Sequence, residues 1–424
     1  MDYNLFLRHL RGPTLTRIII FLSIMGPGII TASVDNDAGG ITTYSLAGSQ
    51  FGYVLLWTFI PITIALAIIQ EMGVRMGVVS GKGLASLIRE RAGVRITFLL
   101  MFALLLTNFG NTLAEFSGIA VSAGIFGVPR LIALPLAAVF VWGLVVKGSY
   151  KSVEKIFLAA SLLYVSYILA GLLAHPDWNQ AALHVAVPQI SYNQAYLAML
   201  IGLVGTTIAP WMQFYIQSSI VEKGVPVKDL IYSRIDAFTG AIIVNVVAFF
   251  IVVMCAATIY TNGVHVNNVA DVSAALLPLA GQYAGVLFAF GLLNASLFAA
   301  SILPLSTAYV VSEGLGLEAG VSKSFSEAPV FHGLYVGIIA VSALIIMIPN
   351  APLLSILYVS QIINGILLPI ILIFMLVIIN DTRVMGDYVN SKIYNYVTCC
   401  RVHTIICICS GNGVRSICSR TNIN

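Results

Sequence analysis

Three polar residues in a row, Asp35, Asn36 and Asp37, interrupt a long apolar stretch near the start of the chain. A carboxylate at membrane depth is costly unless it has a partner or water, so such a group indicates a functional site. Gly39 and Gly40 follow, and two glycines inside an apolar segment predict that the backbone unwinds. Unwound backbone is tolerated in a membrane only where it lines a cavity. The stretch therefore predicts a broken helix around a cation site.

The composition excludes an ordinary soluble protein. Hydrophobic residues make up 59% of the chain and charged residues 9%, whereas soluble domains carry about 25% charged residues. We therefore expect an all-α polytopic membrane protein. The net charge of +4 does not indicate a nucleic-acid partner, because the basic residues lie in short loops between apolar segments and are better explained by membrane orientation.

Ten apolar segments approach the length of about 17 to 25 residues that crosses a bilayer. They lie near residues 17–48, 52–79, 96–126, 131–146, 153–174, 195–221, 238–260, 283–311, 331–348 and 352–379. The corresponding organisation is a cytoplasmic N-terminus (1–16), five spans (17–174), an extracellular loop (175–194), five more spans (195–379) and a tail that is cytoplasmic or disordered (380–424).

The Lys and Arg residues support this alternation. With the N-terminus inside, every one of them except Arg130 falls in a segment, or at an end of a span, that the ten spans place on the cytoplasmic side, as the positive-inside rule requires. No cleavable signal peptide is expected. The pattern predicts a multi-pass protein of the plasma membrane with a cytoplasmic N-terminus, surrounded by the lipid bilayer.

The sixth span should break as the first does. Pro210 removes a backbone donor and disfavours helix at Ala209, and Gly202, Gly205 and Thr206 weaken the turn before it. Interrupted helices at corresponding positions of two five-helix halves indicate an inverted repeat with the site at its interface. The half-helix ends supply carbonyl oxygens that suit a cation.

The motifs resemble one family of proteins over most of the chain. The similar segments, in the family's order, are GPGIITASVDNDAGG with AGSQFGYVLLW, then QEMGVRMGVVSGKGLA, AEFSG, YVSQIINGILLP and NDTRVMGDYVNSK. They resemble the NRAMP divalent-metal transporters. This resemblance implies a leucine-transporter-like fold, in which two inverted five-helix repeats have broken first and sixth helices, and a transporter rather than an enzyme.

Two departures from the family pattern concern the metal site. The family's DPGN motif reads Asp37, Ala38, Gly39 and Gly40, and its sixth-span MPH begins at Ala209. The resemblance implies that the missing Met thioether no longer favours soft metals, because sulfur is a poor partner for Mg²⁺. A wider pocket lined only by oxygen suits Mg²⁺, which keeps several waters. The pattern is similar to the NRAMP-related magnesium transporters.

The metal site is expected at Asp35, Asn36, Asp37, Gly40, Thr206, Ala209, Trp211 and Gln361. Asp37 is the expected central ligand, and its alternative is a structural carboxylate bonded to backbone amides. Asp35 and Asn36 hold the ion's water in one interpretation, and Asp35 lies in a solvated vestibule in the other. Gln361 matches a family glutamine that enters the site, and Trp211 is either a pocket wall or core. No cofactor is expected apart from the transported ion.

Proton coupling should be lost. The family carries titratable groups near the site, and the corresponding positions here hold Thr112 and Gln217, although Glu115 is kept as a neighbouring anion or a structural group. The ninth span has no charge. Because a proton needs a titratable relay, the sequence predicts uncoupled uptake of Mg²⁺, and of Mn²⁺, by alternating access. The oligomeric state is left open, and a monomer is compatible with the sequence.

Three alternatives remain at this point. The first is a proton-coupled Mn²⁺ or Fe²⁺ symporter of the classical family type. The second is an amino-acid symporter of the same architecture, which the anionic first break disfavours because it would repel a substrate carboxylate. The third is an intramembrane protease with paired aspartates, which is disfavoured because no second transmembrane aspartate is expected outside the first break.

Two further features have mainly structural interpretations. Glu71 and Arg75 form an i,i+4 pair that is expected to stabilise its helix. Five cysteines crowd the last 26 residues together with His403, where the family continues into an eleventh apolar span. We expect this tail to be aberrant or truncated and poorly ordered rather than a metal-binding segment.

Overall fold

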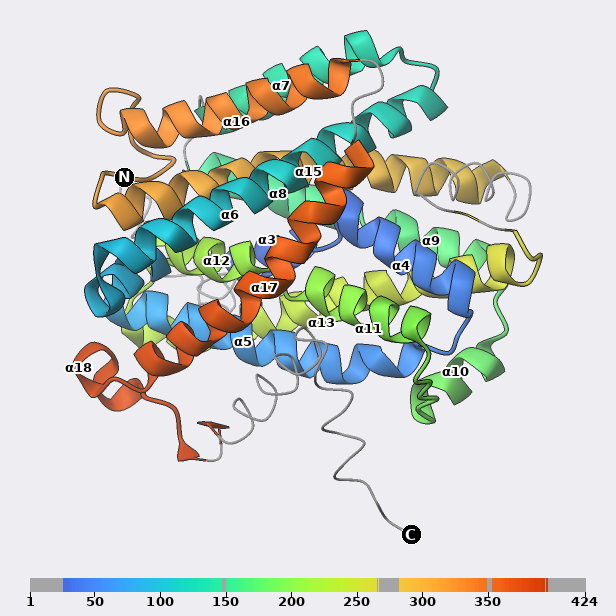
Figure 1. Cartoon of the computed structure of the whole chain (residues 1–424), viewed down its shortest axis with the longest axis horizontal. Coiled ribbons are helices and arrows are strands. Elements are labelled where there is room, and N and C mark those ends of the chain that lie inside the picture. The colour runs from blue at the N-terminus through green and yellow to red at the C-terminus, as the bar shows by residue number, and fades with distance from the viewer. Residues whose placement is uncertain are drawn as a thin grey trace, which may run out of the picture.

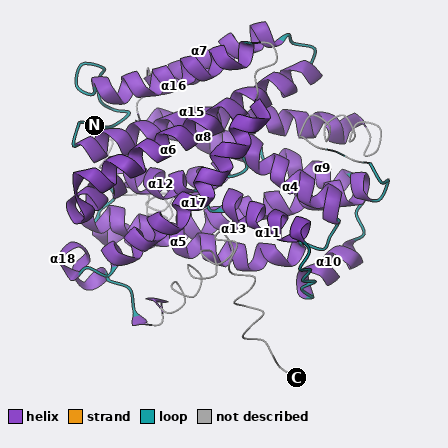
Figure 2. Ribbon diagram, in the orientation of Figure 1, coloured by secondary structure: helices purple, strands orange, loops and turns teal. Residues whose placement is uncertain are grey.

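A computed structural model describes residues 26–146, 150–264, 266, 282–348, 353–392 and 394–395 (Figure 1). Helices joined by loops make up this part of the chain, and Figure 2 shows no strand within it. Seven helices in the described part are long and apolar enough to cross a membrane, or eight if one bent pair after residue 366 counts as a span. The architecture is all-α, as the sequence predicts.

The helices of the first half cover the first five apolar segments. They are α3 (Pro27–Val34), α4 (Ala38–Phe51), the 3₁₀ turn η1 (Leu56–Thr58), α5 (Phe59–Ser80), α6 (Leu84–Ile125), α7 (Arg130–Val146), α8 (Tyr150–Leu162) and α9 (Val165–Leu173). The fifth segment is therefore interrupted between α8 and α9. The connection that follows, expected as a loop, contains a short helix, α10 (Trp178–Ala186).

The second half repeats this order. It contains α11 (Gln194–Thr207), α12 (Pro210–Lys223), the 3₁₀ turn η2 (Val227–Asp229), α13 (Leu230–Cys255), a π-helical turn η3 (Ala256–Tyr260), α15 (Gln282–Leu315), α16 (Pro329–Met347), α17 (Leu353–Ile379), α18 (Thr382–Met385) and the turn η4 (Gly386–Tyr388). The Cys-rich residues beyond 395, and the first 25 residues, lie outside the described part.

Helices at corresponding positions of the two halves pack against each other. α5 contacts α13, α6 contacts α15, and α7 contacts α16, and the last pair runs along one edge of Figure 1. The broken helices pair crosswise, since α3 contacts α12 while α4 contacts α11. This is the arrangement expected of an inverted repeat, and it brings the two breaks to the same region of the bundle.

The outer surface is apolar, as a protein in lipid requires. Leu99 on α6 is 67% exposed and Leu136 on α7 is 64% exposed. The buried core instead contains polar groups such as Gln70, Gln213 and Asn108, each fully buried. An apolar exterior around polar interior positions is typical of a transporter bundle.

The α3 and α13 helices touch backbone to backbone. A Cβ atom added to Gly28 would lie 2.6 Å from the amide nitrogen of Ala237, and one added to Gly240 would lie 2.6 Å from the carbonyl oxygen of Gly28. Both positions therefore need glycine because no side chain fits between the helices. The contact fixes the first half of the broken first helix directly on α13.

Candidate metal site

The first break lies at Asp35, Asn36 and Asp37, between α3 and α4. The break comes just before the two glycines rather than at them, because Gly39 and Gly40 already belong to the first turn of α4. Asp35 keeps a right-handed helical conformation, whereas Asp37 is extended. All three side chains are buried, with 2%, 1% and 9% of their residue surfaces exposed.

Asp37 caps α4. Its Oδ1 accepts a hydrogen bond of 2.6 Å from the amide of Gly40, which satisfies one of the free donors at the start of a helix. Asp37 is therefore bonded to a backbone amide, as the alternative interpretation of a structural carboxylate predicts. A cap uses one carboxylate oxygen in this way and is compatible with a second interaction at the other.

Gly40 is required by a close approach of the backbone. A Cβ atom at this position would overlap the carbonyl oxygen of Asp35 and would lie 3.4 Å from Oδ1 of Asp37. The family's asparagine side chain could not stand here without moving the break. Glycine at position 40 thus lets the chain fold back so that Asp35 and Asp37 share one small volume.

Asp35 is the least satisfied residue of the break. Neither of its carboxylate oxygens has a hydrogen-bond partner among the described residues, and both are buried. Asn36 donates through Nδ2 to the carbonyl of Val244 at 3.3 Å, while its Oδ1 has no partner in the described chain. Buried oxygens of this kind are unfavourable unless something else binds them, so Asp35 and Asn36 offer acceptors to a cation.

The second break lies at Ile208 and Ala209. Ala209 is extended, with φ −76° and ψ 144°, directly before Pro210, which opens α12. Because Pro210 has no N–H group, the carbonyl of Thr206 lacks the donor that a continuous helix would supply. The Thr206 residue is half-buried and Ala209 is 6% exposed. The carbonyl oxygens of this break are therefore candidate ligands for an ion.

Trp211 belongs to the core. It is 1% exposed, its ring lies 6.3 Å from that of Tyr215 between centroids, and its carbonyl accepts a hydrogen bond of 3.2 Å from Ser306. Of the two interpretations left open by the sequence, packing in the apolar cluster describes the observed environment.

A hydrogen bond that the sequence did not reveal joins the two broken helices. The hydroxyl of Tyr44 on α4 lies 2.9 Å from Oγ1 of Thr207, the last residue of α11. Tyr44 is close enough to interact electrostatically with both Asp35 and Asp37. The aspartates of the first break and the break of the sixth span are therefore neighbours, and the tyrosine between them could not be identified from the local sequence pattern.

Glu115 connects α6 to the first break. Both of its carboxylate oxygens accept from the amide of Ala38, at 3.2 and 3.0 Å, and the residue is fully buried. It also interacts electrostatically with Asp37. The sequence left two interpretations of Glu115 open, a neighbouring anion and a structural group. Both describe its observed position, because Glu115 caps α4 and adds negative charge beside the break.

A second aspartate lies inside the membrane-spanning helices, which corrects the sequence prediction. Asp236 is fully buried on α13, because that helix starts eight residues before the segment expected from residue 238. Its carboxylate accepts from the amides of Gly28 at 2.6 Å and Ile29 at 3.3 Å. Asp236 therefore caps α3, and its oxygens are occupied by backbone donors rather than aimed at Asp35 or Asp37.

The remaining expected ligand lies outside the described side chains. Gln361 is a residue of α17, but its side-chain position falls among those that the structure does not describe. Within the described part, no three His, Cys, Asp or Glu side chains converge closely enough to hold a metal ion by themselves. The candidate site in the described part thus comprises Asp35, Asn36 and Asp37 with carbonyl oxygens from the second break.

Comparisons with known proteins agree with this architecture. The sequence profile of the family described as "Natural resistance-associated macrophage protein-like" matches residues 28–414. A divalent metal cation transporter MntH from Burkholderia ambifaria is 26% identical over 387 residues, covering 88% of this chain and 84% of that protein. MntH from Ralstonia nicotianae is 29% identical, covering 89% of this chain and 88% of its own length.

Solved structures give the same fold. A crystal structure of a manganese transporter from Eremococcus coleocola, in complex with an aromatic bis-isothiourea substituted compound, superposes with a TM-score of 0.76 at 18% identity. It covers 94% of this chain and 87% of that one. The leucine-transporter-like fold and the family resemblance expected from the motifs are confirmed. Since the family profile spans most of the sequence, the chain belongs to the Nramp family of multi-pass membrane transporters.

Proposed function

We propose that this protein carries divalent metal cations across a membrane by alternating access, with Mg²⁺ as the preferred ion and Mn²⁺ as a second substrate. The observation that supports this most directly is Asp35, a buried carboxylate with two unpartnered oxygens beside Asn36 and Asp37. The names of the relatives, which are divalent metal cation and manganese transporters, support the class of substrate.

The preference for a hard ion rests on the donor atoms. The break residues offer carboxylate, amide and carbonyl oxygens, and Ala209 stands where the family motif has methionine. The next methionine along α12, Met212, is fully buried in the apolar cluster. Oxygen donors suit Mg²⁺, and thioethers suit softer metals.

A partly hydrated ion fits the small number of protein ligands. Mg²⁺ dehydrates reluctantly and is usually bound through one or two carboxylates with several waters. Asp35 and Asp37 supply two carboxylates, and Asn36 supplies an amide oxygen without a partner in the described chain. Water would complete the coordination shell, with Thr206 and Ala209 carbonyls as further oxygen donors.

Transport without proton coupling is part of the proposal. Thr112 donates its hydroxyl to the carbonyl of Asn108 at 2.7 Å, and Gln217 donates to the carbonyl of Lys82 at 2.8 Å. Neither side chain titrates, so neither relays a proton. Uptake would then follow the membrane potential, which is worth about 2.3 kcal/mol per elementary charge per 100 mV.

A proton-coupled Mn²⁺ or Fe²⁺ symporter is the second candidate. It is favoured by the electrostatic interaction of Glu115 with Asp37, which couples a titratable group to the site, and by the manganese transporters among the relatives. We further propose a plasma-membrane location with the N-terminus in the cytoplasm, from the distribution of Lys and Arg.

Ion uptake into proteoliposomes tests both candidates. The full-length protein is reconstituted, and entry of Mg²⁺, Mn²⁺ and Ca²⁺ is measured in competition, with a pH-sensitive dye in the lumen. The proposal expects Mg²⁺ entry without acidification. Entry of Mn²⁺ that tracks acidification, with Mg²⁺ excluded, would establish the second candidate instead.

Two variants locate the site. Asp37→Ala should abolish uptake of every ion, and the exposed Asp387→Ala should leave it unchanged. Ala209→Met should shift the preference towards Mn²⁺ and Cd²⁺, because it restores a soft donor. Uptake that survives Asp37→Ala, or a selectivity that Ala209→Met leaves unaltered, would contradict the assignment.

A further inference from the structure

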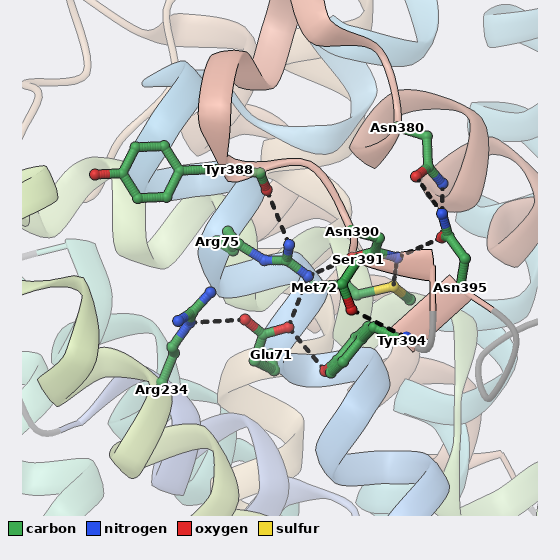
Figure 3. A network of polar contacts seen from close by, with 10 residues as sticks. All are labelled: Glu71, Met72, Arg75, Arg234, Asn380, Tyr388, Asn390, Ser391, Tyr394 and Asn395. Carbon is green, nitrogen blue, oxygen red and sulfur yellow. Dashed lines mark hydrogen bonds and ion pairs between the residues drawn. The ribbon is translucent and has the colours of Figure 1, made fainter.

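A polar cavity lies away from the aspartates, where α5 and α13 meet the segment after α17 (Figure 3). We call it the arginine pocket. Its volume is about 320 Å³, and its lining includes Glu71 and Arg75 of α5, Arg234 and Phe238 of α13, and Ser391 and Tyr394. The sequence predicted only a local pair between Glu71 and Arg75, whereas the structure places that pair at the centre of a network.

Glu71 and Arg75 each make several contacts inside this network. Glu71 accepts from Arg75 at 3.0 Å and from the hydroxyl of Tyr394 at 2.9 Å, and pairs with Nε of Arg234 at 2.8 Å. Arg75 also donates to the carbonyl of Tyr388 at 2.9 Å and to Asn390 at 2.5 Å. One carboxylate is thus shared by two guanidinium groups, so the pocket keeps one positive charge in excess.

The excess charge is available at Arg234. Its side chain is 34% exposed, and its two Nη atoms make no hydrogen bond or ion pair with any residue of the described ranges. Ser391 is exposed, and its oxygen already accepts from the amide of Tyr394 at 3.2 Å, so its hydroxyl proton is free to donate outward. A planar guanidinium with unused donors beside a hydroxyl suits the oxygens of a phosphate.

The mouth of the pocket borders the lipid-facing surface. Ile231, Ile235, Phe238 and Ile242 of α13 are 54%, 42%, 40% and 55% exposed. Their spacing puts them along one side of the helix, and Phe238 also lines the pocket. Apolar side chains that face lipid therefore continue into the cavity that holds Arg234.

The end of the bundle at which the pocket lies also favours an anionic ligand. Arg234 lies in the second turn of α13, close to Lys228 of η2 and to Lys392 in the segment after α17, both exposed. The Lys and Arg pattern places this end in the cytoplasm. Basic pockets between transmembrane helices on that side bind anionic headgroups, because the inner leaflet carries negative lipids.

We propose that the arginine pocket binds the phosphate headgroup of an anionic phospholipid. Arg234 and Ser391 hold the phosphate oxygens, while the acyl chains lie along Ile235, Phe238 and Ile242. Since Arg75 attaches the segment around Tyr388 and Asn390 to α5, a lipid bound here would sit on the joint between α5, α13 and the chain after α17. The binding does not depend on which ion the protein transports.

Native mass spectrometry of the full-length protein tests this. The protein is released from nanodiscs of equal parts phosphatidylglycerol and phosphatidylcholine, and retained lipids are counted. We expect preferential retention of one phosphatidylglycerol, reduced about fivefold by Arg234→Gln. Arg234→Lys should keep most of it, and Lys323→Gln, at an exposed site outside the pocket, should keep all of it.

Two results would overturn the proposal. One is equal retention of the two lipids by the wild-type protein, a measurement that does not require any variant to fold. The other is displacement of phosphatidylglycerol by inorganic phosphate at millimolar concentration, which would identify a site for free phosphate instead of a lipid. If the liposome assay showed no ion uptake, the result of the lipid-retention experiment would still be interpreted in the same way, because that experiment does not measure transport.

Discussion

The carboxylate of Asp236 on α13 caps the first turn of α3, through a hydrogen bond of 2.6 Å from the amide of Gly28, 208 residues earlier in the chain. The same carboxylate accepts from Ile29. The first half of the broken helix is therefore held at its start by the second half of the protein. This makes the geometry of the metal site a product of both repeats.

Replacing Asp236 should loosen α3. Asp236→Asn keeps one acceptor oxygen but turns an amide NH₂ towards a backbone donor, which leaves a buried N–H unpaired and costs about 1–3 kcal/mol. We expect a lower melting temperature and faster amide exchange in the peptide that contains Gly28 and Ile29. The control Asp387→Asn, at an exposed turn, should change neither. Unaltered exchange in α3 would show that the cap is dispensable.

Tyr44 and Thr207 should be energetically coupled. Because Thr207 donates its own hydroxyl proton to the carbonyl of Leu203 at 2.8 Å, Tyr44 acts as the donor between them. A double-mutant cycle of Tyr44→Phe and Thr207→Ala should give a coupling energy of about 0.5–1.5 kcal/mol in thermal unfolding. Additive effects would mean that this bond does not join the two breaks. Tyr164→Phe is the control, since that hydroxyl has no hydrogen-bond partner in the described chain.

Asp35→Asn should have opposite effects with and without metal. In the metal-free protein it removes a buried, unpartnered charge, so the melting temperature should rise, by the equivalent of at least about 1 kcal/mol. With Mg²⁺ or Mn²⁺ present, the stabilisation that the ion gives to the wild-type protein should be smaller in the variant. Thermal unfolding in chelator and in a metal series measures both. A variant that is less stable in chelator would indicate that Asp35 has a partner of its own.

Gly40→Ala should disturb the site through the backbone. The added methyl group overlaps the carbonyl of Asp35, and the resulting shift should destabilise the protein by about 1–3 kcal/mol and reduce uptake. Gly205→Ala is matched to it on the other broken helix, where a Cβ meets nothing within 4 Å. That variant should be neutral or stabilising, since alanine favours helix by about 1 kcal/mol. Similar losses in both variants would refute the steric explanation.

Asp381, which precedes α18, should make acid stability depend on one partly exposed carboxylate. Bonds from the side chain and amide of Arg383 lower its pKa from 3.8 to about 2. A folded-state pKa below the unfolded value gives stability that is present above pH 3.8 and is lost as the pH falls towards 2. The difference in melting temperature between the wild-type protein and Asp381→Asn should therefore shrink over that range. A difference that grows on acidification would contradict this sign.

The sequence predicted both breaks because their causes are local. Pro210 cannot donate a hydrogen bond, and a lipid-facing helix cannot continue through charged residues. Each break could therefore be predicted from a few neighbouring residues. The family motifs then supplied the fold, since their order along the chain extends over most of it. The prediction that the glycines themselves unwind was wrong because Gly40 serves a steric need and lies within α4.

The partners of the break residues could not be predicted. Asp236 caps Gly28, Glu115 caps Ala38, and Tyr44 contacts Thr207 across separations of 208, 77 and 163 residues. Each bond depends on how the helices pack, and nothing in the local pattern distinguishes a capping aspartate from an ion ligand. Asp236 was placed outside the membrane for a related reason, since a polar residue near a helix start is easily assigned to a loop.

The backbone contact between Gly28 and Gly240 restricts how α3 can move. With no side chain between the two helices, a sliding or rotating motion of α3 would drive Gly28 into Ala237 or Gly240. Movement of α3 away from α13 would instead release both of its bonds to Asp236 together. Because packed helix interfaces are bistable rather than continuously deformable, we expect α3 to be either docked or detached, so a gate built on it would work as a latch rather than as a valve that opens by degrees.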